Sequence, residues 1–316
     1  MLAKKKPIVL CLMGPTASGK TDLAIALAQA FPIEIINVDS AQIYQGLDIG
    51  SGKPALSIRQ QIPHHLMDFL DPALAYSAAQ FCQDAKEIIA DILQRNKLPV
   101  LVGGTMLYFK ALQQGLSVLP NADPSLREQL TQQAQIQGWL ALHQQLQNID
   151  PVSASQIRPS DPHRILRALE IYYLTGKPKS YWVSQPREEV SPFKFINISV
   201  EPIISPRAEL HQRIAVRFNA MLEQGFVQEV AKLQARGDLK PTLPAIRAVG
   251  YRQIWQYLLG EISEENMKAN VIAATRQLAK RQLTWLRHWQ DVMRFDFQAE
   301  QLVTEVVQTM KKFTCF

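Results

Sequence analysis

The stretch "PIVLCLMGPTASGKTDLAIALAQAFP" (residues 7–32) combines a short apolar run, a glycine-containing loop and a helical segment that ends at Pro32. Its loop fits the pattern G-x-x-x-x-G-K-[ST] without deviation, and it lies between a predicted strand and a predicted helix, as this motif requires. Glycines let backbone N–H groups face an anion, and the helix N-terminus adds its positive end. Lys20 is expected to reach terminal phosphate oxygens, and the Thr21 hydroxyl is expected to bind Mg²⁺. The predicted phosphate-binding residues are Gly14, Pro15, Thr16, Ala17, Ser18, Gly19, Lys20 and Thr21.

The segments that follow this loop alternate between strands and helices. "IEIINVDS" (33–40) and "LPVLVGGT" (98–105) read as buried strands, and residues 64–72 as a short strand or an extended segment. Between them, residues 77–96 have helical spacing, with Ser77 as a plausible N-cap. Nearly all-apolar strands separated by helices are typical of a parallel sheet covered on both faces. We therefore expect an α/β fold, a P-loop NTPase-like parallel sheet flanked by helices.

The character of the chain changes near residue 119. Residues 119–192 contain no convincing strand and read as helices separated by proline-rich and Asp-Pro breaks. "FKFINISVEP" (193–202) alternates like a strand and would return the chain to the sheet. We expect an inserted all-helical domain at 119–192 between two parts of the core, 1–118 and 193–316. Further helices are expected at about 207–236, 244–259 and 263–290.

Composition is that of an ordinary globular protein, with 47% hydrophobic and 20% charged residues among 316. The apolar run near the N-terminus is too short for a signal sequence, and no run approaches the roughly 18 apolar residues of a membrane span. The three cysteines, Cys11, Cys82 and Cys315, form no C-x-x-C or Cys/His cluster, which argues against a disulfide framework or a zinc site. The sequence predicts a cytoplasmic protein with no membrane association.

Polar residues follow each predicted core strand. Gly14–Thr21, Asp39–Gln42 and Gly103–Thr105 should converge, because ligands in such sheets lie beyond the carboxyl ends of the strands. A nucleotide hydrolase would normally carry an acid at the end of another core strand, but "LVGGT" has none, and the acid is Asp39. Small-molecule kinases also place an acid near there. A solvated N-cap role for Asp39 and a simple helix-start turn at 103–105 remain open on motif grounds.

Basic clusters point to a polyanionic partner. The net charge is +6, and "ATRQLAKRQLTWLRHW" (274–289) contains four Lys/Arg and no acid. On a helix, Arg276, Lys280 and Arg287 fall within about 40° of one another, with Leu278, Trp285, Leu286 and Trp289 on the opposite, packing side. "RAVGYRQIW" (247–255) and "HRILRALEIYY" (163–173) supply two more basic clusters. Each could be a solvated face, but the three together favour RNA or DNA.

Six segments, taken in order, resemble the bacterial tRNA dimethylallyltransferases. This resemblance implies transfer of a dimethylallyl group from dimethylallyl diphosphate to N6 of the adenosine at tRNA position 37, 3′ of the anticodon, with release of diphosphate. It also implies Mg²⁺ as cofactor and an insertion that clasps the anticodon stem. The segments are "GPTASGKT", "VDSAQIYQGLDIGSGKP" (38–54), "LVGGTMLYFKAL" (101–112), "LPNADP" (119–124), "RAVGYRQIW" (247–255) and "LAKRQLTWLR" (278–287).

The resemblance also assigns residues to roles. Asp39 corresponds to the family's catalytic base, Thr105 to its contact with the substrate base, and Arg217 to an arginine on the diphosphate, with Arg213 as a possible helper. Other segments correspond to tRNA contacts. These are Asp39, Ser40, Ala41 and Gln42; Thr105; Asp123; His163, Arg164, Ile165, Leu166 and Arg167; Arg247, Ala248, Val249, Gly250, Tyr251 and Arg252; and Lys280, Arg281, Gln282, Leu283, Thr284, Trp285, Leu286 and Arg287.

Two other functions stay open on the residues alone. A P-loop kinase of a small metabolite or nucleoside would consume ATP and need no RNA. A nucleotide-gated RNA-binding protein would bind RNA in response to ATP without product chemistry. The sequence does not decide whether ATP also binds the loop, and a monomer is the default expectation.

Overall fold

The computed structural model describes residues 6–117, 119–185, 191–204 and 207–313. It divides into two compact units, one made of Met1–Gln113 with Ser191–Phe316 and the other of Gln114–Val190. The second unit overlaps the helical insertion expected at 119–192 but begins at Gln114 and ends at Val190. Cys315 lies outside the described residues.

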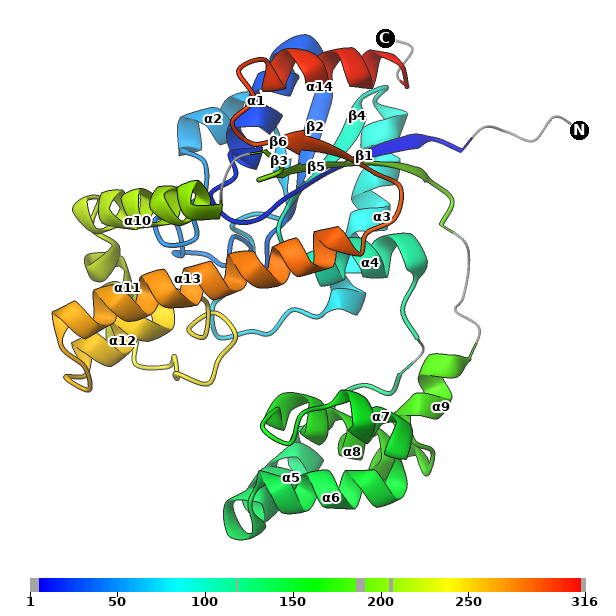
Figure 1. The fold of residues 1–316 in the computed structure, drawn as a ribbon, viewed down its shortest axis with the longest axis vertical. Helices are drawn as coiled ribbons and strands as arrows, with labels where there is room; N and C mark the ends of the chain where they lie inside the picture. The colour runs from blue at the N-terminus through cyan, green and yellow to red at the C-terminus, as the bar shows by residue number, and fades with distance from the viewer. Residues whose placement is uncertain (1–5, 118, 186–190, 205–206, 314–316) are drawn as a thin grey trace, which may run out of the picture. The chain divides into compact units, whose positions relative to one another are not determined.

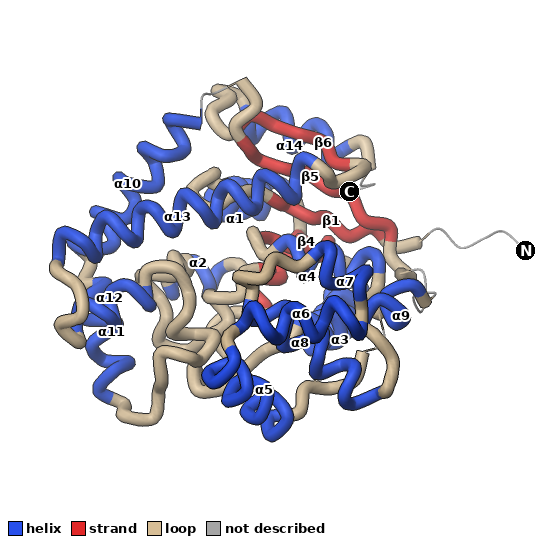
Figure 2. Tube along the Cα trace, turned by 60° about the horizontal axis from the view of Figure 1, so that its bottom comes forward, coloured by secondary structure: helices blue, strands red, loops and turns tan. Residues whose placement is uncertain are grey.

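The first unit is built on a parallel sheet, as predicted (Figures 1 and 2). Its strand order is β3-β2-β4-β1-β5-β6, and every neighbouring pair is parallel. The central strand pairs on both sides, with Leu10 opposite Val100 on one neighbour and opposite Ile196 on the other. The strands are β1 (Ile8–Met13), β2 (Ile33–Val38), β3 (His64–His65), β4 (Leu98–Gly103), β5 (Lys194–Glu201) and β6 (Val292–Asp296).

Helices cover both faces of this sheet because its crossover connections run in opposite directions. The chain moves from β1 across to β2 through α1 and back to β4 through α3, so right-handed crossovers place these two helices on opposite faces. Figure 1 shows α14 beside α1. The helices of this unit are α1 (Lys20–Ala30), α2 (Leu56–Gln61), α3 (Ala78–Gln94), α4 (Met106–Gln114), α10 (Arg207–Glu223), α11 (Phe226–Ala235), α12 (Tyr251–Leu258), α13 (Glu264–Arg287) and α14 (Leu302–Lys311).

Local signals explain where several helices begin and end. Ser77 caps α3 as predicted, because its hydroxyl accepts the N–H of Gln80 and the Gln80 side chain accepts the N–H of Ser77. The single helix predicted at 207–236 is wrong: Gly225, with φ of 98°, separates α10 from α11. The start predicted at 244 is also wrong, since turns occupy 241–250. Neither β6 nor α14 was predicted; β6 is a short, half-exposed edge strand with a weak pattern.

A separate apolar cluster lies beside the main core in this unit. It joins Ile43, Tyr44 and Leu47 from the loop after β2 to side chains of α10 through α13, including Phe226 and Tyr251. This packing holds the segment after Asp39 against helices that lie far away in the sequence.

The second unit is a small helical bundle. Asp123, Asp150 and Asp161 each accept a backbone N–H at the start of a helix and each precede a proline at the first helical position. No strand occurs among the residues of this unit that the structure describes. Its helices are α5 (Pro124–Gln137), α6 (Trp139–Ile149), α7 (Pro151–Gln156), α8 (Pro162–Thr175) and α9 (Lys179–Ser184).

One buried carboxylate connects the elements of this bundle. Glu170 on α8 is fully buried and accepts hydrogen bonds from the Asp123 N–H (2.9 Å), from Arg127 Nε (2.8 Å) and from Arg167 Nη1 (2.5 Å). Burial alone would raise the pKa of Glu170, but the hydrogen bonds from both arginines outweigh it and keep the pKa below its usual value. Arg167 also donates to the Pro120 carbonyl, so the segment before α5 is tied to α8.

We expect Glu170→Gln to loosen this bundle while leaving the sheet intact. The amide keeps the shape of the carboxylate but turns an N–H group toward existing donors, so the free energy of local opening should fall by about 2–4 kcal/mol. Hydrogen exchange should then speed up in α5 and α8 and stay unchanged in β1 and β4. Glu128→Gln, an exposed change on α5, is the matched control. Equal protection in both variants would refute the structural role of Glu170.

Candidate active site

The P-loop curls tightly between β1 and α1. Gly14 must be glycine, because a Cβ there would lie 2.4 Å from the Val200 carbonyl oxygen on β5. Gly19 has a φ of 85° and caps α1. Lys20 opens the helix, and its ammonium folds back to donate to the Pro15 carbonyl at 2.6 Å. The loop thus surrounds the N-terminus of α1 and the Lys20 ammonium, as an anion site requires.

Two cations face the same cavity. Burial lowers the pKa of Lys20 to about 7; Asp39 opposes this shift and Arg217 adds to it. Burial also lowers the pKa of Arg217. Within the described residues, neither Lys20 nor Arg217 has an ion-pair partner within 4.0 Å. A polyanion bound here would restore the full charge of Lys20, so the cavity is suited to a diphosphate.

Asp39 follows the end of β2 and is held by the Asn37 side chain and the Ala41 backbone. Asn37 accepts the Asp39 N–H at 3.1 Å and donates to the Asp39 carbonyl at 3.0 Å and to the Leu66 carbonyl at 2.9 Å. One carboxylate oxygen of Asp39 accepts the Ala41 N–H at 2.9 Å. No helix begins after Asp39, so the N-cap interpretation is wrong. Its carboxylate lines the same cavity as Lys20.

The ends of β2 and β4 are tied together at Thr105. The Thr105 N–H donates to the Val38 carbonyl at 3.0 Å, and the Thr105 hydroxyl oxygen accepts the Ser40 N–H at 3.0 Å. Gly103 allows the close approach, because a Cβ there would lie 2.1 Å from the Val38 carbonyl oxygen. The structure therefore brings Asp39, Ser40 and Thr105 into one place beside the P-loop.

A glutamine from α13 joins this loop to the P-loop. Gln282 is buried; its carbonyl oxygen accepts the Thr16 N–H at 2.8 Å, and its amide donates to the Gly104 carbonyl at 3.0 Å. The resemblance gave Gln282 only as one member of a tRNA-contact segment. Burial and both hydrogen bonds show that it fixes the spacing of two loops, and a tRNA contact by Gln282 stays a prediction.

The cavity is lined by both polar and apolar side chains. Its volume is about 150 Å³, and its polar lining includes Thr16, Lys20, Asp39 and Arg217. A wider space of about 900 Å³ shares Lys20, Thr21 and Arg217 with this cavity, and its lining also includes Lys53 and Arg213. Sequence reasoning did not assign the apolar lining, because most of its residues are scattered over α10, α11, α13 and the loop before α12. Those from this part of the chain include Ile214, Phe218, Met221, Phe226, Val249, Val271 and Leu278.

The predicted tRNA-contact segments of the first unit are partly exposed and partly buried. On α13, Lys280, Arg281 and Arg287 are exposed, whereas Leu286 is fully buried. Trp285 was placed on the packing side, which is wrong: it is 38% exposed, with Lys110 Nζ 5.6 Å from its ring centroid. The buried stripe of α13 runs instead through Ala279, Gln282, Leu283 and Leu286.

The predicted tRNA-contact segment at residues 247–252 also contains both exposed and buried side chains. Arg247 and Arg252 are exposed, whereas Tyr251 is fully buried and donates its hydroxyl to Glu229 at 2.7 Å. The arginines are therefore available to a phosphate backbone, and the tyrosine packs.

The remaining predicted contacts belong to the helical unit. His163 and Arg164 are exposed at the start of α8, and Arg164 forms an ion pair with Asp161 at 3.3 Å. Ile165 is fully buried in the core of the bundle, so its side chain packs. Asp123 caps α5, and Arg167 binds Glu170, as described above. A tRNA contact by any of these residues stays a prediction.

Two absences concern the described part of the chain. No helix there is both long and apolar enough to cross a membrane. No group of three or more His, Cys, Asp or Glu side chains there could hold a metal ion by itself.

The fold and this site define a P-loop protein with a helical insertion and a cavity lined by two half-buried cations and a carboxylate. The family model described as IPP transferase matches residues 42–289, and the one described as isopentenyl transferase matches residues 7–65. The chain therefore belongs to the IPP transferase family.

Individual relatives agree with this assignment. The chain is 52% identical over 307 residues to the tRNA dimethylallyltransferase of Coxiella burnetii, covering 97% of this chain and 98% of the relative. A solved tRNA isopentenylpyrophosphate transferase from Bacillus halodurans is 34% identical, with a TM-score of 0.71 and coverage of 98% of this chain and 96% of that chain. A eukaryotic dimethylallyltransferase acting on tRNA is 28% identical, with a TM-score of 0.77 and coverage of 97% and 79%.

The lowered pKa of Lys20 predicts proton uptake when a diphosphate binds. Above pH 7 the free protein has lost this proton, whereas the bound anion favours the charged ammonium, so affinity should fall by up to about tenfold per pH unit above 7. Calorimetry with Mg²⁺-pyrophosphate at pH 8, in buffers of different ionisation enthalpy, should give up to one more proton taken up by the wild type than by Lys20→Met. Equal proton uptake by the two proteins would contradict the assignment.

Proposed function

We propose that this protein transfers a dimethylallyl group from dimethylallyl diphosphate to N6 of the adenosine at tRNA position 37. The observation that carries the proposal is the placement of Lys20, Arg217 and Asp39 around one cavity that also has an apolar lining. The two cations suit a diphosphate, the apolar lining suits a five-carbon tail, and the carboxylate suits an amine that loses a proton. Membership in the family supports the same reaction.

The two cations would act on the leaving group. As the C1–O bond of the donor breaks, its electron pair moves to the diphosphate oxygen, and negative charge grows beside Lys20 and Arg217. Fixed charges that already face this position stabilise the transition state more than the ground state. The apolar lining would keep water away from the allylic carbon, whose cation-like character makes it prone to hydrolysis. The P-loop thus serves carbon–oxygen rather than phosphorus–oxygen cleavage.

Asp39 would act on the acceptor. The N6 lone pair is delocalised into the adenine ring, and a carboxylate is too weak a base to deprotonate a neutral amine. It can orient the N–H, and it can accept the proton once the new N–C bond makes that proton acidic. We propose that Thr105, whose hydroxyl oxygen accepts the Ser40 N–H at the same edge, contacts the base.

Mg²⁺ fits the donor set of the P-loop. Thr21 lines both spaces beside Lys20, and one protein hydroxyl together with diphosphate oxygens and water is the kind of ligand set that Mg²⁺ uses with phosphates. When bound, Mg²⁺ would neutralise part of the diphosphate charge.

The adenosine must leave the anticodon-loop stack to reach Asp39. In a single-stranded loop this costs only a few kcal/mol. We propose that the exposed basic side chains of α13 and of residues 247–252 bind the tRNA backbone, and that the helical insertion contributes further contacts. We further propose that the enzyme acts in the cytoplasm as a monomer.

Asp39→Asn should slow transfer strongly without weakening tRNA binding. The amide keeps the size of the side chain but cannot accept the N6 proton, so kcat should fall about 10²–10⁴-fold. The test incubates the protein with Mg²⁺, unmodified tRNA and labelled dimethylallyl diphosphate, then measures label in digested adenosine. Asp91→Asn, on the outside of α3, should be as active as the wild type. Full turnover by Asp39→Asn would show that the base is another group.

Arg287→Ala should weaken tRNA binding and reduce its dependence on salt. Loss of one phosphate contact lowers the slope of log K against log[salt] by about one. Lys311→Ala removes the same charge from α14 and serves as the matched control. If both variants have the same salt slope, the basic face of α13 does not track the tRNA backbone.

A further inference from the structure

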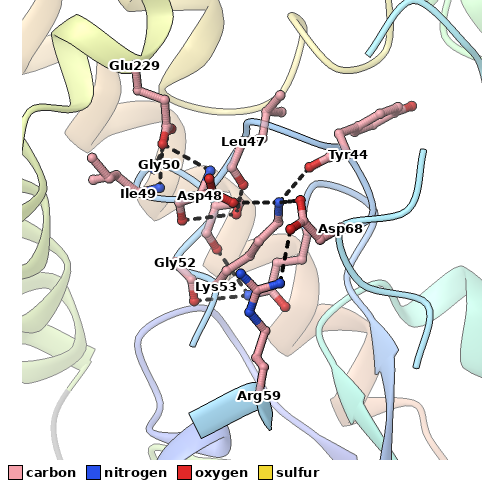
Figure 3. A network of polar contacts seen from close by, with 12 residues as sticks. Tyr44, Leu47, Asp48, Ile49, Gly50, Gly52, Lys53, Arg59, Asp68 and Glu229 are labelled. Carbon is pink, nitrogen blue, oxygen red and sulfur yellow. Dashed lines mark hydrogen bonds and ion pairs between the residues drawn. The ribbon is translucent and has the colours of Figure 1, made fainter. Parts of the chain in front are cut away.

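A turn of the chain at Asp48–Gly52 is held by one carboxylate from another helix. The backbone N–H groups of Asp48, Ile49 and Gly50 donate to Glu229 on α11, at 3.0, 2.7 and 3.1 Å (Figure 3). Tyr251 donates its hydroxyl to the same carboxylate at 2.7 Å. Three successive N–H groups form an anion-binding nest, and here the anion is a side chain of the protein itself.

The other end of this turn is held by a buried lysine. Lys53, whose side chain is 1% exposed, donates to the Tyr44 carbonyl at 2.6 Å, to Asp48 at 2.8 Å and to Asp68 at 2.6 Å (Figure 3). Burial alone would raise the pKa of Asp68, but hydrogen bonds from Lys53 and Arg59 outweigh it and lower the pKa. The turn is thus fixed from two sides.

This turn touches one of the two cations of the candidate active site. Gly52 has a φ of 66°, and a Cβ there would lie 1.8 Å from Arg217 Nη2, so the guanidinium rests directly on the glycine backbone. Gly50 packs equally closely on the ring of Phe226, which belongs to the apolar lining. A displacement of the turn would therefore move Arg217 or open space beside it.

We propose that Glu229 is a positioning residue for Arg217. Its carboxylate accepts the three N–H groups and so fixes the turn, and the turn holds the Arg217 guanidinium toward the diphosphate site. This proposal rests on the proposed function in one respect, which is that the anion bound at the P-loop is a diphosphate. Glu229 lines neither space of the site, and it acts through Gly52.

Glu229→Gln is the direct test. It keeps the shape of the side chain but replaces one acceptor oxygen with an N–H₂ group that faces existing donors. Mg²⁺-pyrophosphate, measured by calorimetry, should bind about 5–30-fold more weakly, and the KM for dimethylallyl diphosphate should rise by a similar factor. The Kd for tRNA should stay within about twofold. Glu223→Gln, an exposed change at the end of α10, should change none of these values.

A double-mutant cycle separates positioning from general destabilisation. In an Arg217→Ala background, Glu229→Gln should cause no further loss of pyrophosphate affinity, because the group that it positions is gone. Gly52→Ala, which inserts a Cβ where the guanidinium lies, should reproduce the loss from the other side. Additive losses in the cycle, or unchanged pyrophosphate affinity in Glu229→Gln, would overturn the proposal. If the wild-type protein binds pyrophosphate but alkylates no RNA, only the proposed function is refuted. The pyrophosphate affinities of the double-mutant cycle would still test the role of Glu229.

Discussion

The parallel pairing of β1 with β4, and of β4 with β2, is the constraint on which the site depends. It brings the carboxyl ends of three strands to one edge of the sheet, so the P-loop after Met13, Asp39 after β2 and Thr105 after β4 become neighbours. The close approach of Gly103 to Val38 and the hydrogen bond from the Ser40 N–H to the Thr105 hydroxyl oxygen fix that edge. Without this register, the three loops would be unrelated surface features.

The second organising feature is the concentration of positive charge in a half-buried cavity. Lys20 and Arg217 both lose solvation there and repel one another, and Asp39 compensates for only part of this. Such an arrangement is unfavourable in the empty protein. It therefore favours the binding of an anion, and it stabilises negative charge that develops there during a reaction. A carboxylate in the same space would repel a diphosphate that stays bound, but it is useful once a proton must be removed from the acceptor. The combination suits a reaction in which diphosphate departs as an amine is alkylated.

The sequence alone predicts those parts of the site that depend on short local patterns. The P-loop, Asp39 and the parallel sheet belong to this group, because spacing of glycines and runs of apolar residues act locally. Gln282 and Glu229 do not belong to this group. Each is a single polar residue whose hydrogen-bond partner lies more than 170 positions away in the sequence, as in the pairs Thr16–Gln282 and Glu229–Ile49. The apolar lining is scattered in the same way. The break at Gly225 was missed because the helical periodicity continues on both sides of it.

The central claim, that the P-loop holds a diphosphate leaving group, is tested most directly by the fate of one oxygen atom. Dimethylallyl diphosphate labelled with oxygen-18 between C1 and the first phosphorus would be reacted with unmodified tRNA and Mg²⁺, and the products analysed by mass. Carbon–oxygen cleavage predicts that all of the label leaves in pyrophosphate while the tRNA adenosine gains the dimethylallyl group. Label recovered in dimethylallyl alcohol, with phosphate transferred or released instead, would mean that the loop catalyses phosphorus–oxygen cleavage and would contradict the account.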